Sequence, residues 1–231
     1  MNQLVTQGII LTRRDYGEAD RIITLLTPEQ GKLSMLAKGV RRPKSKMAGG
    51  IELFSVSDIT YIKGRGELHT LISARLNKYY DHIVHDIDRV QTGYELIKIL
   101  HKATEDQPEA EYFELLKTAF AALDNIDIDL DVVRLWFLAQ LLRYDGHEPN
   151  LLTDTEGNKL SADKTYNFDF DAMTFQGDPH GSFTPDHIKT LRILFSDNSP
   201  AAINHVQGVA VQLMDLTPLL RTMSQTYLRA S

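Results

Sequence analysis

The densest group of basic side chains lies in Lys38–Lys46, which reads KGVRRPKSK and places five Lys or Arg among nine residues with no acid between them. Gly39, Pro43 and the Gly49-Gly50 pair indicate a loop, not a helix face. Cationic loops of this kind bind the phosphates of nucleic-acid backbones. The alternative is a solvated run kept for solubility, but mixed signs and acids serve solubility better than a purely basic cluster. The segment therefore predicts a loop that binds a polyanion.

Further cations lie at strand ends and turns that the sequence predicts in the same region. Together with the loop they give ten predicted residues for nucleic-acid binding: Arg13, Arg14, Arg21, Lys38, Arg41, Arg42, Lys44, Lys46, Lys63 and Arg65. Aromatic residues that could stack on bases are scarce there, namely Tyr16, Phe54, Tyr61, Tyr79 and Tyr80, and Phe54 is expected in the core. Binding should then depend on phosphate contacts, with little base specificity.

The distribution of charge along the chain agrees with a polyanion partner for the first part. Residues 1–80 contain 13 Lys+Arg and 7 Asp+Glu, whereas residues 81–231 contain 12 and 24. Such asymmetry indicates two surfaces with different partners, the basic one facing a polyanion. The plainer alternative is that the two halves complement each other across a domain interface.

Motifs for catalysis and cofactors are not found. The sequence has no phosphate-binding P-loop, no dinucleotide fingerprint, no G-x-S-x-G and no H-E-x-x-H. It has no cysteine, which excludes disulfides, thiolate zinc sites and cysteine nucleophiles. The acids of residues 124–131 lack the glycine of a calcium loop. His82 and His85 lie one helical turn apart and could share a metal, but two ligands alone do not make a site. A zinc bound by His147, His180 and His187 with Asp154 and Asp178 is conceivable, although their spacing matches no known frame. We expect a non-enzymatic protein without catalytic residues, cofactor or metal.

The first 80 residues have the pattern of a small closed β-barrel. Short apolar runs rich in β-formers are separated by glycine-bearing turns. The expected strands are 7–12, 21–26, 32–37, 51–54, 56–62 and 68–76.

After residue 80 the hydrophobic period becomes that of helices. A first helix should bury Ile83, Ile87, Val90, Tyr94 and Ile97. Further helices are expected at about 109–123, 130–144, 185–195 and 206–228, the last interrupted or kinked near Pro218. Residues 146–183 form an irregular polar insert with one expected hairpin, 166–170 with 173–175.

These elements predict an α+β fold in two domains, a small closed β-barrel at 1–80 and a helical domain at 81–231. The longest apolar runs are too short for a membrane span, and the N-terminus lacks the charge order of a secretory signal. We therefore expect a cytoplasmic protein without membrane contact.

The N-terminal residues resemble those of the bacterial recombination mediator family RecO. The resembling segments are GIIL at 8–11, RDYGEADRII at 14–23, TPEQGKL at 27–33, AKGVRRPKSK at 37–46 and ELF at 52–54. The resemblance covers nearly the whole basic region in order. Beyond it, the helical region is similar in layout and length only.

The resemblance implies an N-terminal OB-fold and a C-terminal helical domain. It also implies binding of single- and double-stranded DNA, annealing of complementary strands, and partnership with RecR and the single-stranded-DNA-binding protein. Loading of the recombinase RecA in the RecF pathway of repair would be assisted indirectly. Many members carry a four-cysteine zinc finger where this chain has the cysteine-free insert, so the hairpin and the aromatics Tyr166, Phe168, Phe170 and Phe175 should hold it instead. The alternative function is a protein-interaction adaptor whose acidic helical domain is the working surface.

Overall fold

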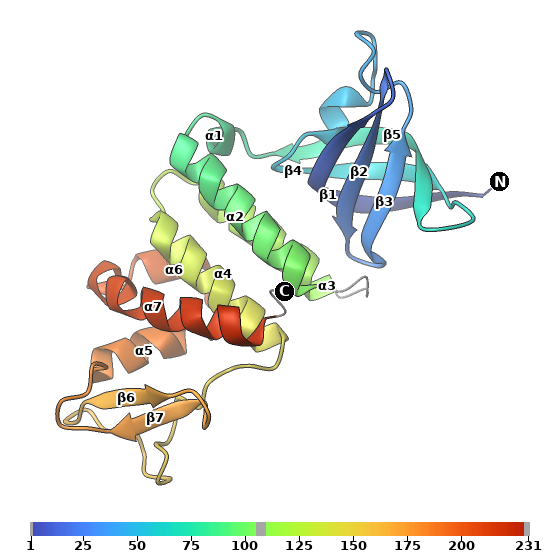
Figure 1. The fold of residues 1–231 in the computed structure, drawn as a ribbon. Helices are drawn as coiled ribbons and strands as arrows, with labels where there is room; N and C mark the ends of the chain where they lie inside the picture. The colour runs from blue at the N-terminus through green and yellow to red at the C-terminus, as the bar shows by residue number, and fades with distance from the viewer. Residues whose placement is uncertain (1, 105–109, 229–231) are drawn as a thin grey trace. The chain divides into compact units, whose positions relative to one another are not determined.

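The computed structural model describes residues 2–104 and 110–228. The described residues form an N-terminal β-barrel followed by helices and one small hairpin, so the predicted α+β class is confirmed (Figure 1). No helix among these residues is both long enough and apolar enough to cross a membrane.

Five strands close the barrel in the order β1-β2-β3-β5-β4. All neighbours pair antiparallel except β3 and β5, which pair in parallel between Ser34–Leu36 and Leu68–Thr70. The interior is filled by apolar side chains at alternate strand positions, among them Ile10, Ile23, Leu25, Met35 and Ile59. The strands are β1 (Gln3–Tyr16), β2 (Asp20–Thr27), β3 (Gly31–Ala37), β4 (Ser55–Ile62) and β5 (Leu68–Tyr79).

A β-bulge in β1 decides which side of the barrel its later residues face. Ile10 pairs with Leu25 but Thr12 pairs with Thr24, so Leu11 is an extra residue. Ile9, Ile10 and Leu11 are accordingly all buried. After the bulge the alternation resumes, with Arg13 opposite the buried Ile23 and Arg14 opposite the outward Ile22.

The prediction of a strand at 51–54 is wrong. Residues Ala48–Ile51 form the short 3-10 helix η1, and the chain turns at Phe54, whose φ of 56° is left-handed. Ile51 is fully buried in the barrel core. Gly50 lies so close to Ala74 of β5 that a Cβ there would be 2.3 Å from the Ala74 carbonyl oxygen. The apolar run is therefore a plug that packs on the barrel and not a paired strand.

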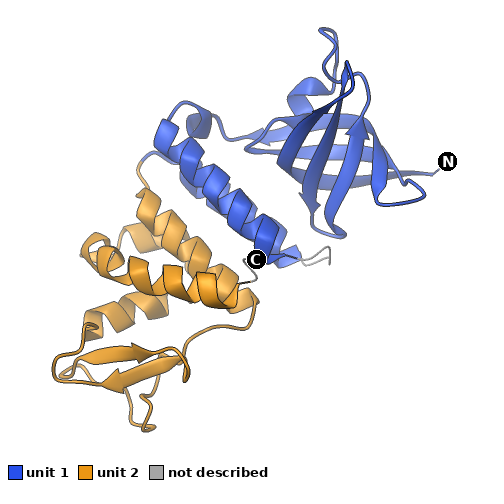
Figure 2. Cartoon of the chain, viewed as in Figure 1, with its two compact units in different colours: residues 1–126 blue, residues 127–231 orange. Residues whose placement is uncertain are grey.

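Three helices complete the first compact unit, residues 1–126 (Figure 2). They are α1 (Asp81–Val84), α2 (Ile87–Ala103) and α3 (Ala110–Asp124). The predicted inward residues of α3, including Leu116 and Phe120, are buried.

The single helix face predicted for residues 83–97 is partly wrong. The helix breaks at His85 and restarts with Asp86 as N-cap, so Ile87 and Tyr94 are exposed while Thr92, Gly93 and Leu96 are buried. Phe54 packs its ring edge against Tyr94 at 5.3 Å and Phe120 at 5.5 Å. Phe54 thus joins the barrel to the helices, and the compact units divide at 126/127, whereas the last barrel strand ends at Tyr79.

The second compact unit, residues 127–231, is helical with the hairpin inserted. Its helices are α4 (Leu130–Tyr144), α5 (Pro185–Leu194), α6 (Pro200–Asn204) and α7 (Val209–Tyr227). The predicted hairpin is present as β6 (Tyr166–Asp169) and β7 (Thr174–Gly177). The helix predicted at 206–228 begins instead at Val209, and it runs through Pro218 without interruption.

Candidate nucleic-acid interface

The basic loop is fixed to the barrel at both of its ends. Val40 is 3% exposed and belongs to the barrel core, and Ile51 is fully buried. Between them, the loop also bonds to the β1–β2 turn, because the Arg41 N–H donates to the Ala19 carbonyl at 2.9 Å. The Gly39 N–H donates to Asp20 Oδ1 at 2.7 Å, and the φ of Gly39 is 65°. These anchors present the basic residues at one end of the barrel, beside the β1–β2 turn (Figure 1).

Three of the ten predicted cations are paired with carboxylates at this end. Arg21 Nε donates to Asp15 Oδ1 at 2.9 Å, and Arg41 Nε lies 3.4 Å from Asp15 Oδ2. The hydrogen bond from Arg21, followed by the charge of Arg41, holds the pKa of Asp15 below its usual range. Arg13 donates to Glu52 at 2.7 Å and to the Ile51 carbonyl at 3.4 Å. These three arginines connect the basic loop to the hairpin formed by β1 and β2.

Five other predicted cations are exposed and have no carboxylate partner among the described residues. They are Arg14, Lys38, Arg42, Lys44 and Lys46. Their charges are available to an anion without first breaking an internal ion pair. The structure therefore divides the loop end into three bracing arginines and five available cations, a division that side-chain type alone does not reveal.

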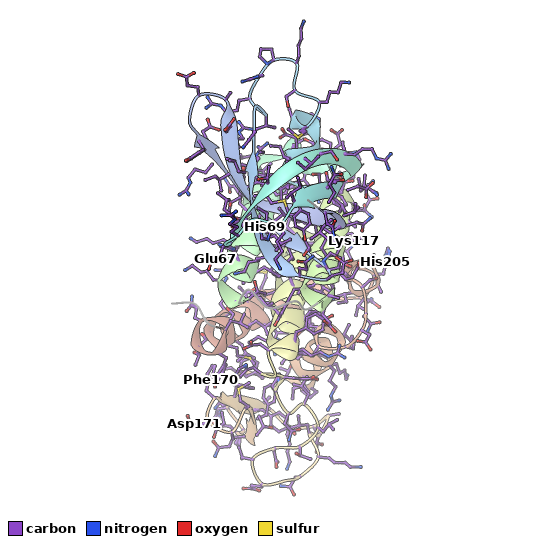
Figure 3. All side chains as sticks on the ribbon, turned by 90° about the vertical axis from the view of Figure 1, so that its right-hand side faces the viewer. Glu67, His69, Lys117, Phe170, Asp171 and His205 are labelled. Carbon is purple, nitrogen blue, oxygen red and sulfur yellow. The ribbon has the colours of Figure 1, made fainter. Side chains whose placement is uncertain are left out.

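Lys63 and Arg65 are not brought to the loop end. They belong to the β4–β5 turn, which follows Ile62, and Ile62 pairs with Gln3 at the start of β1. Arg13 and Arg14, by contrast, lie near the end of β1. Figure 3 shows the labelled Glu67 and His69 marking this second end, well below the loop. Both Lys63 and Arg65 are exposed there.

His69 closes the barrel at this second end. It is 6% exposed, stacks on Tyr61 with ring centroids 5.5 Å apart, and accepts a hydrogen bond from the Gly64 N–H at Nδ1. Burial, and then the charge of Lys63, lower the pKa of His69. The imidazole is therefore neutral and serves as a cap for the turn.

Most aromatic residues of the barrel are unavailable for stacking on a base. Tyr61 is fully buried, Tyr80 is 3% exposed, and Phe54 is 2% exposed as predicted. Burial raises the pKa of Tyr80 to about 12. Tyr16, the residue before the β1–β2 turn, is 55% exposed.

The insert does not have the donor set that a zinc finger requires. The chain has no thiolate, and the described residues hold no group of three or more His, Asp or Glu that could bind a metal ion. His147 stacks on Tyr227, while His187 belongs to α5. Aromatic packing holds the hairpin instead, with Phe168 at 5.2 Å from Phe175 and 5.0 Å from Phe170, and Tyr166 at 6.2 Å from Phe175. Figure 3 shows Phe170 and Asp171 at the hairpin's turn.

Thr184, His187 and Asp215 resemble a nucleophilic triad in residue type but not in hydrogen bonding. His187 Nδ1 accepts from the Thr184 backbone N–H at 3.0 Å, which completes a capping box at the start of α5. Its Nε2 lies 3.2 Å from Asp215 Oδ2. Since Nδ1 is occupied by the backbone donor, it cannot take a proton from the Thr184 hydroxyl. The cluster ties α5 to α7.

Comparison with known proteins agrees with this architecture. Residues 1–80 match the family model described as recombination protein O N terminal. This match confirms the resemblance to RecO. Several relatives bear the name DNA repair protein RecO. The one from Alkaliphilus metalliredigens is 31% identical over 147 residues, 63% of this chain and 59% of the relative. The one from Acetivibrio thermocellus is 34% identical over 151 residues, which are 64% of this chain and 59% of the relative.

A third RecO relative, from Heliobacterium modesticaldum, is 34% identical over 145 residues, 63% of this chain and 52% of the relative. The chain thus spans between about half and three fifths of the length of the RecO relatives it matches.

Proposed function

We propose that this chain is a RecO-type DNA-binding protein of DNA repair and recombination, which binds single- and double-stranded DNA through the loop end of its barrel. The observation that carries the proposal is the set of five available cations on a loop and hairpin anchored to the barrel. Phosphate contacts of this kind position a strand without reading its sequence. They also leave the base edges free, which supports annealing of complementary strands as the activity. No catalytic residue takes part.

The relatives' shared name supports the place of this activity in repair. By extension of the resemblance, RecR and the single-stranded-DNA-binding protein are the proposed protein partners, and assistance to RecA loading in the RecF pathway is the proposed outcome. Protein partners would contact surfaces other than the loop end, because its charge suits a polyanion.

A salt titration tests the DNA-binding proposal. If the five available cations each neutralise one phosphate, the slope of log K against log salt on single-stranded DNA should be about −3.5. The variant Arg42→Ala/Lys44→Ala/Lys46→Ala should flatten this slope by about 0.7 per lost contact. A matched control, Lys159→Ala/Lys164→Ala in the insert, removes exposed lysines of the second unit and should leave the slope unchanged.

Two outcomes would contradict the proposal. Absence of salt-dependent binding would favour the adaptor function, with the acidic helical region as the working surface. An unchanged slope in the triple loop variant would show that the loop does not contact phosphates.

A further inference from the structure

The outer face of α2 is formed by residues spaced three and four apart, which lie on one side of a helix. They are Ile87, Gln91, Tyr94, Lys98 and Lys102, and all five are exposed. Ile87 is 68% exposed and Tyr94 is 49% exposed. A helix of a folded domain normally turns its apolar side to the core. In α2 the core side is occupied by other residues, including the buried Gly93 and Leu96, so Ile87 and Tyr94 are apolar residues on the side away from the core.

The charges on this face change sign from one end of the helix to the other. Asp86 is the N-cap and Asp88 lies in the first turn, whereas Lys98 and Lys102 lie in the last two turns. Among the described residues, Asp88, Lys98 and Lys102 have no ion-pair partner. The helix dipole favours acids at the first turn and bases at the last. It does not account for Ile87, an exposed apolar residue beside the acids.

The face is complementary to itself when the direction of the helix is reversed. Two copies of α2 packed antiparallel about a two-fold axis near Gly93 place residue 88 of one copy opposite residue 98 of the other. Asp88 then faces Lys98 of the second copy, and the same contact occurs again on the other side of the axis. Tyr94 lies beside the axis, and Ile87 meets the aliphatic stem of Lys98 of the second copy. A parallel pair would instead place Asp88 opposite Asp88, so the charges select the antiparallel arrangement.

We propose that this face of α2 is the interface of a homodimer, in which two copies of the chain pack antiparallel across Ile87 and Tyr94 and pair Asp88 with Lys98. The helix has 17 residues and is about 25 Å long. An interface built on one such face is at the small end of the range of specific interfaces. The dimer is therefore weak, and its formation depends on the concentration of the protein.

The dimer has a consequence for annealing, which rests on the proposed DNA-binding function. Each copy carries one loop end, so a dimer carries two surfaces that bind DNA backbones. Two complementary strands bound to one dimer meet at an effective concentration set by the assembly and not by their bulk concentrations. The dimer therefore promotes the encounter of strands that a monomer would hold separately.

Sedimentation velocity of the full chain over a concentration series tests the dimer in the absence of DNA. Asp88→Lys and Lys98→Glu should each weaken association about tenfold or more, because each places like charges opposite one another at both symmetric contacts. An equimolar mixture of the two variants should associate as the wild type does, since lysines of the first then face acids of the second at both contacts. Net charge alone predicts opposite effects of the two substitutions, because one makes the acidic chain less negative and the other makes it more negative.

The apolar part of the interface is tested by Ile87→Ser, which should also weaken association. Tyr94 is left unchanged because its ring packs on Phe54. The matched control is Val211→Ser in α7, where the side chain is 64% exposed, and it should leave association unchanged. Circular dichroism shows that each variant is folded.

Chemical crosslinking gives an independent readout, because the chain has no cysteine of its own. Gln91→Cys places a single thiol near the proposed axis, and a short bismaleimide should join two copies of this variant. Lys159→Cys, an exposed position in the insert, is the control and should remain uncrosslinked.

A wild type that stays monomeric at every concentration would overturn the inference. So would a mixture of Asp88→Lys and Lys98→Glu that fails to associate, or equal weakening by Ile87→Ser and Val211→Ser. These outcomes leave the DNA-binding function intact, since they are measured without DNA. Absence of salt-dependent DNA binding in a chain that dimerises would instead refute that function. The mixture should also anneal complementary strands faster than either variant alone at the same total concentration, and equal rates would refute the role of the dimer in annealing.

Discussion

Asp15 Oδ1 accepts a hydrogen bond from Arg21 Nε at 2.9 Å across the first pair of strands, at the end of the barrel where cations gather. The second oxygen of the same carboxylate lies 3.4 Å from Arg41 Nε on the basic loop. Asp15 thus connects the β1–β2 hairpin to the basic loop. Because Arg21 and Arg41 are paired with it, their charges are less available to an incoming phosphate.

Replacing Asp15 with Asn should therefore increase DNA affinity. The change removes one repulsive charge and releases Arg21 and Arg41, which raises affinity about threefold at low salt and less at high salt. Fluorescence anisotropy with a labelled oligonucleotide measures the effect.

Asp58→Asn is the matched control for Asp15→Asn. Asp58 pairs with Arg75 on the β4–β5 side of the barrel, 3.2 Å apart, and the substitution changes net charge equally. Equal gains in both variants would mean that only net charge matters, and the specific role of Asp15 would be refuted.

The stability of the barrel should fall as the pH falls below about 6.5, the ordinary pKa of histidine. The pKa of His69 is lowered in the folded protein, so the folded state binds fewer protons than the unfolded chain. The contribution of neutral His69 to stability is complete above the pKa that the residue has in the unfolded chain. It is lost as the pH decreases through the lower pKa that the residue has in the folded protein. Urea unfolding of wild type and His69→Gln at pH 7.5 and 5.5 measures it. The substitution should reduce the pH dependence; an identical dependence in both proteins would contradict this role of His69.

Gly93→Ala should destabilise the first compact unit by about 1–3 kcal/mol. A Cβ at Gly93 of α2 would lie 2.5 Å from Cε1 of Phe54, whose ring is already packed between Tyr94 and Phe120. Thermal or urea unfolding gives the change in free energy. Gly49→Ala is the control, because no atom lies within 4 Å of a Cβ placed there. Equal stability of the two variants would show that the Phe54 contact can relax without cost.

Much of this fold was predictable from local pattern. Alternation and glycine-bearing turns located all five barrel strands, and the 3.6-residue period located α3 and α4 nearly to the residue. The prediction of a strand at 51–54 was wrong because the apolar residues of this segment pack on the barrel without pairing, and their composition does not distinguish this role from that of a strand. The prediction of one continuous helix face at 83–97 was wrong because the apolar period continues through His85, whereas the helix ends there and a new helix begins with Asp86 as its N-cap.

The candidate interface was predictable by residue type but not by arrangement. Nothing local to Arg13 indicates that Glu52, far along the chain, accepts its hydrogen bond. Nor does the sequence show the extra residue in β1, which puts Arg13 on the side of the buried Ile23 and leaves Arg14 on the outward side with Ile22. Both facts depend on long-range pairing, and they separate bracing cations from available ones.

The insert should keep its stability when metal is removed. Aromatic packing around Phe175, which is fully buried, replaces the thiolate ligands that the chain lacks. Treatment with EDTA should leave the melting temperature unchanged, whereas Phe175→Ala should lower the stability of the second unit by about 3–5 kcal/mol. One zinc per chain by elemental analysis, with a lower melting temperature after chelation, would contradict this. His147, His180 and His187 would then be the first ligands to test.

Strand annealing should proceed without nucleotide or metal and should weaken as salt rises. Two complementary strands repel through their phosphates, and in the proposed mechanism the five available cations at the loop end would neutralise part of one backbone while its base edges stay accessible. The variant Arg41→Ala/Arg42→Ala/Lys44→Ala/Lys46→Ala removes three of these five cations together with the bracing Arg41, and it should therefore anneal much more slowly than wild type. Fluorescence quenching between two labelled complementary oligonucleotides follows the rate directly. The control is Lys159→Ala/Lys164→Ala, which should anneal at the wild-type rate. Annealing that needs ATP, or that continues undiminished in the variant that lacks four of the five loop cations, would refute a mechanism based on phosphate neutralisation.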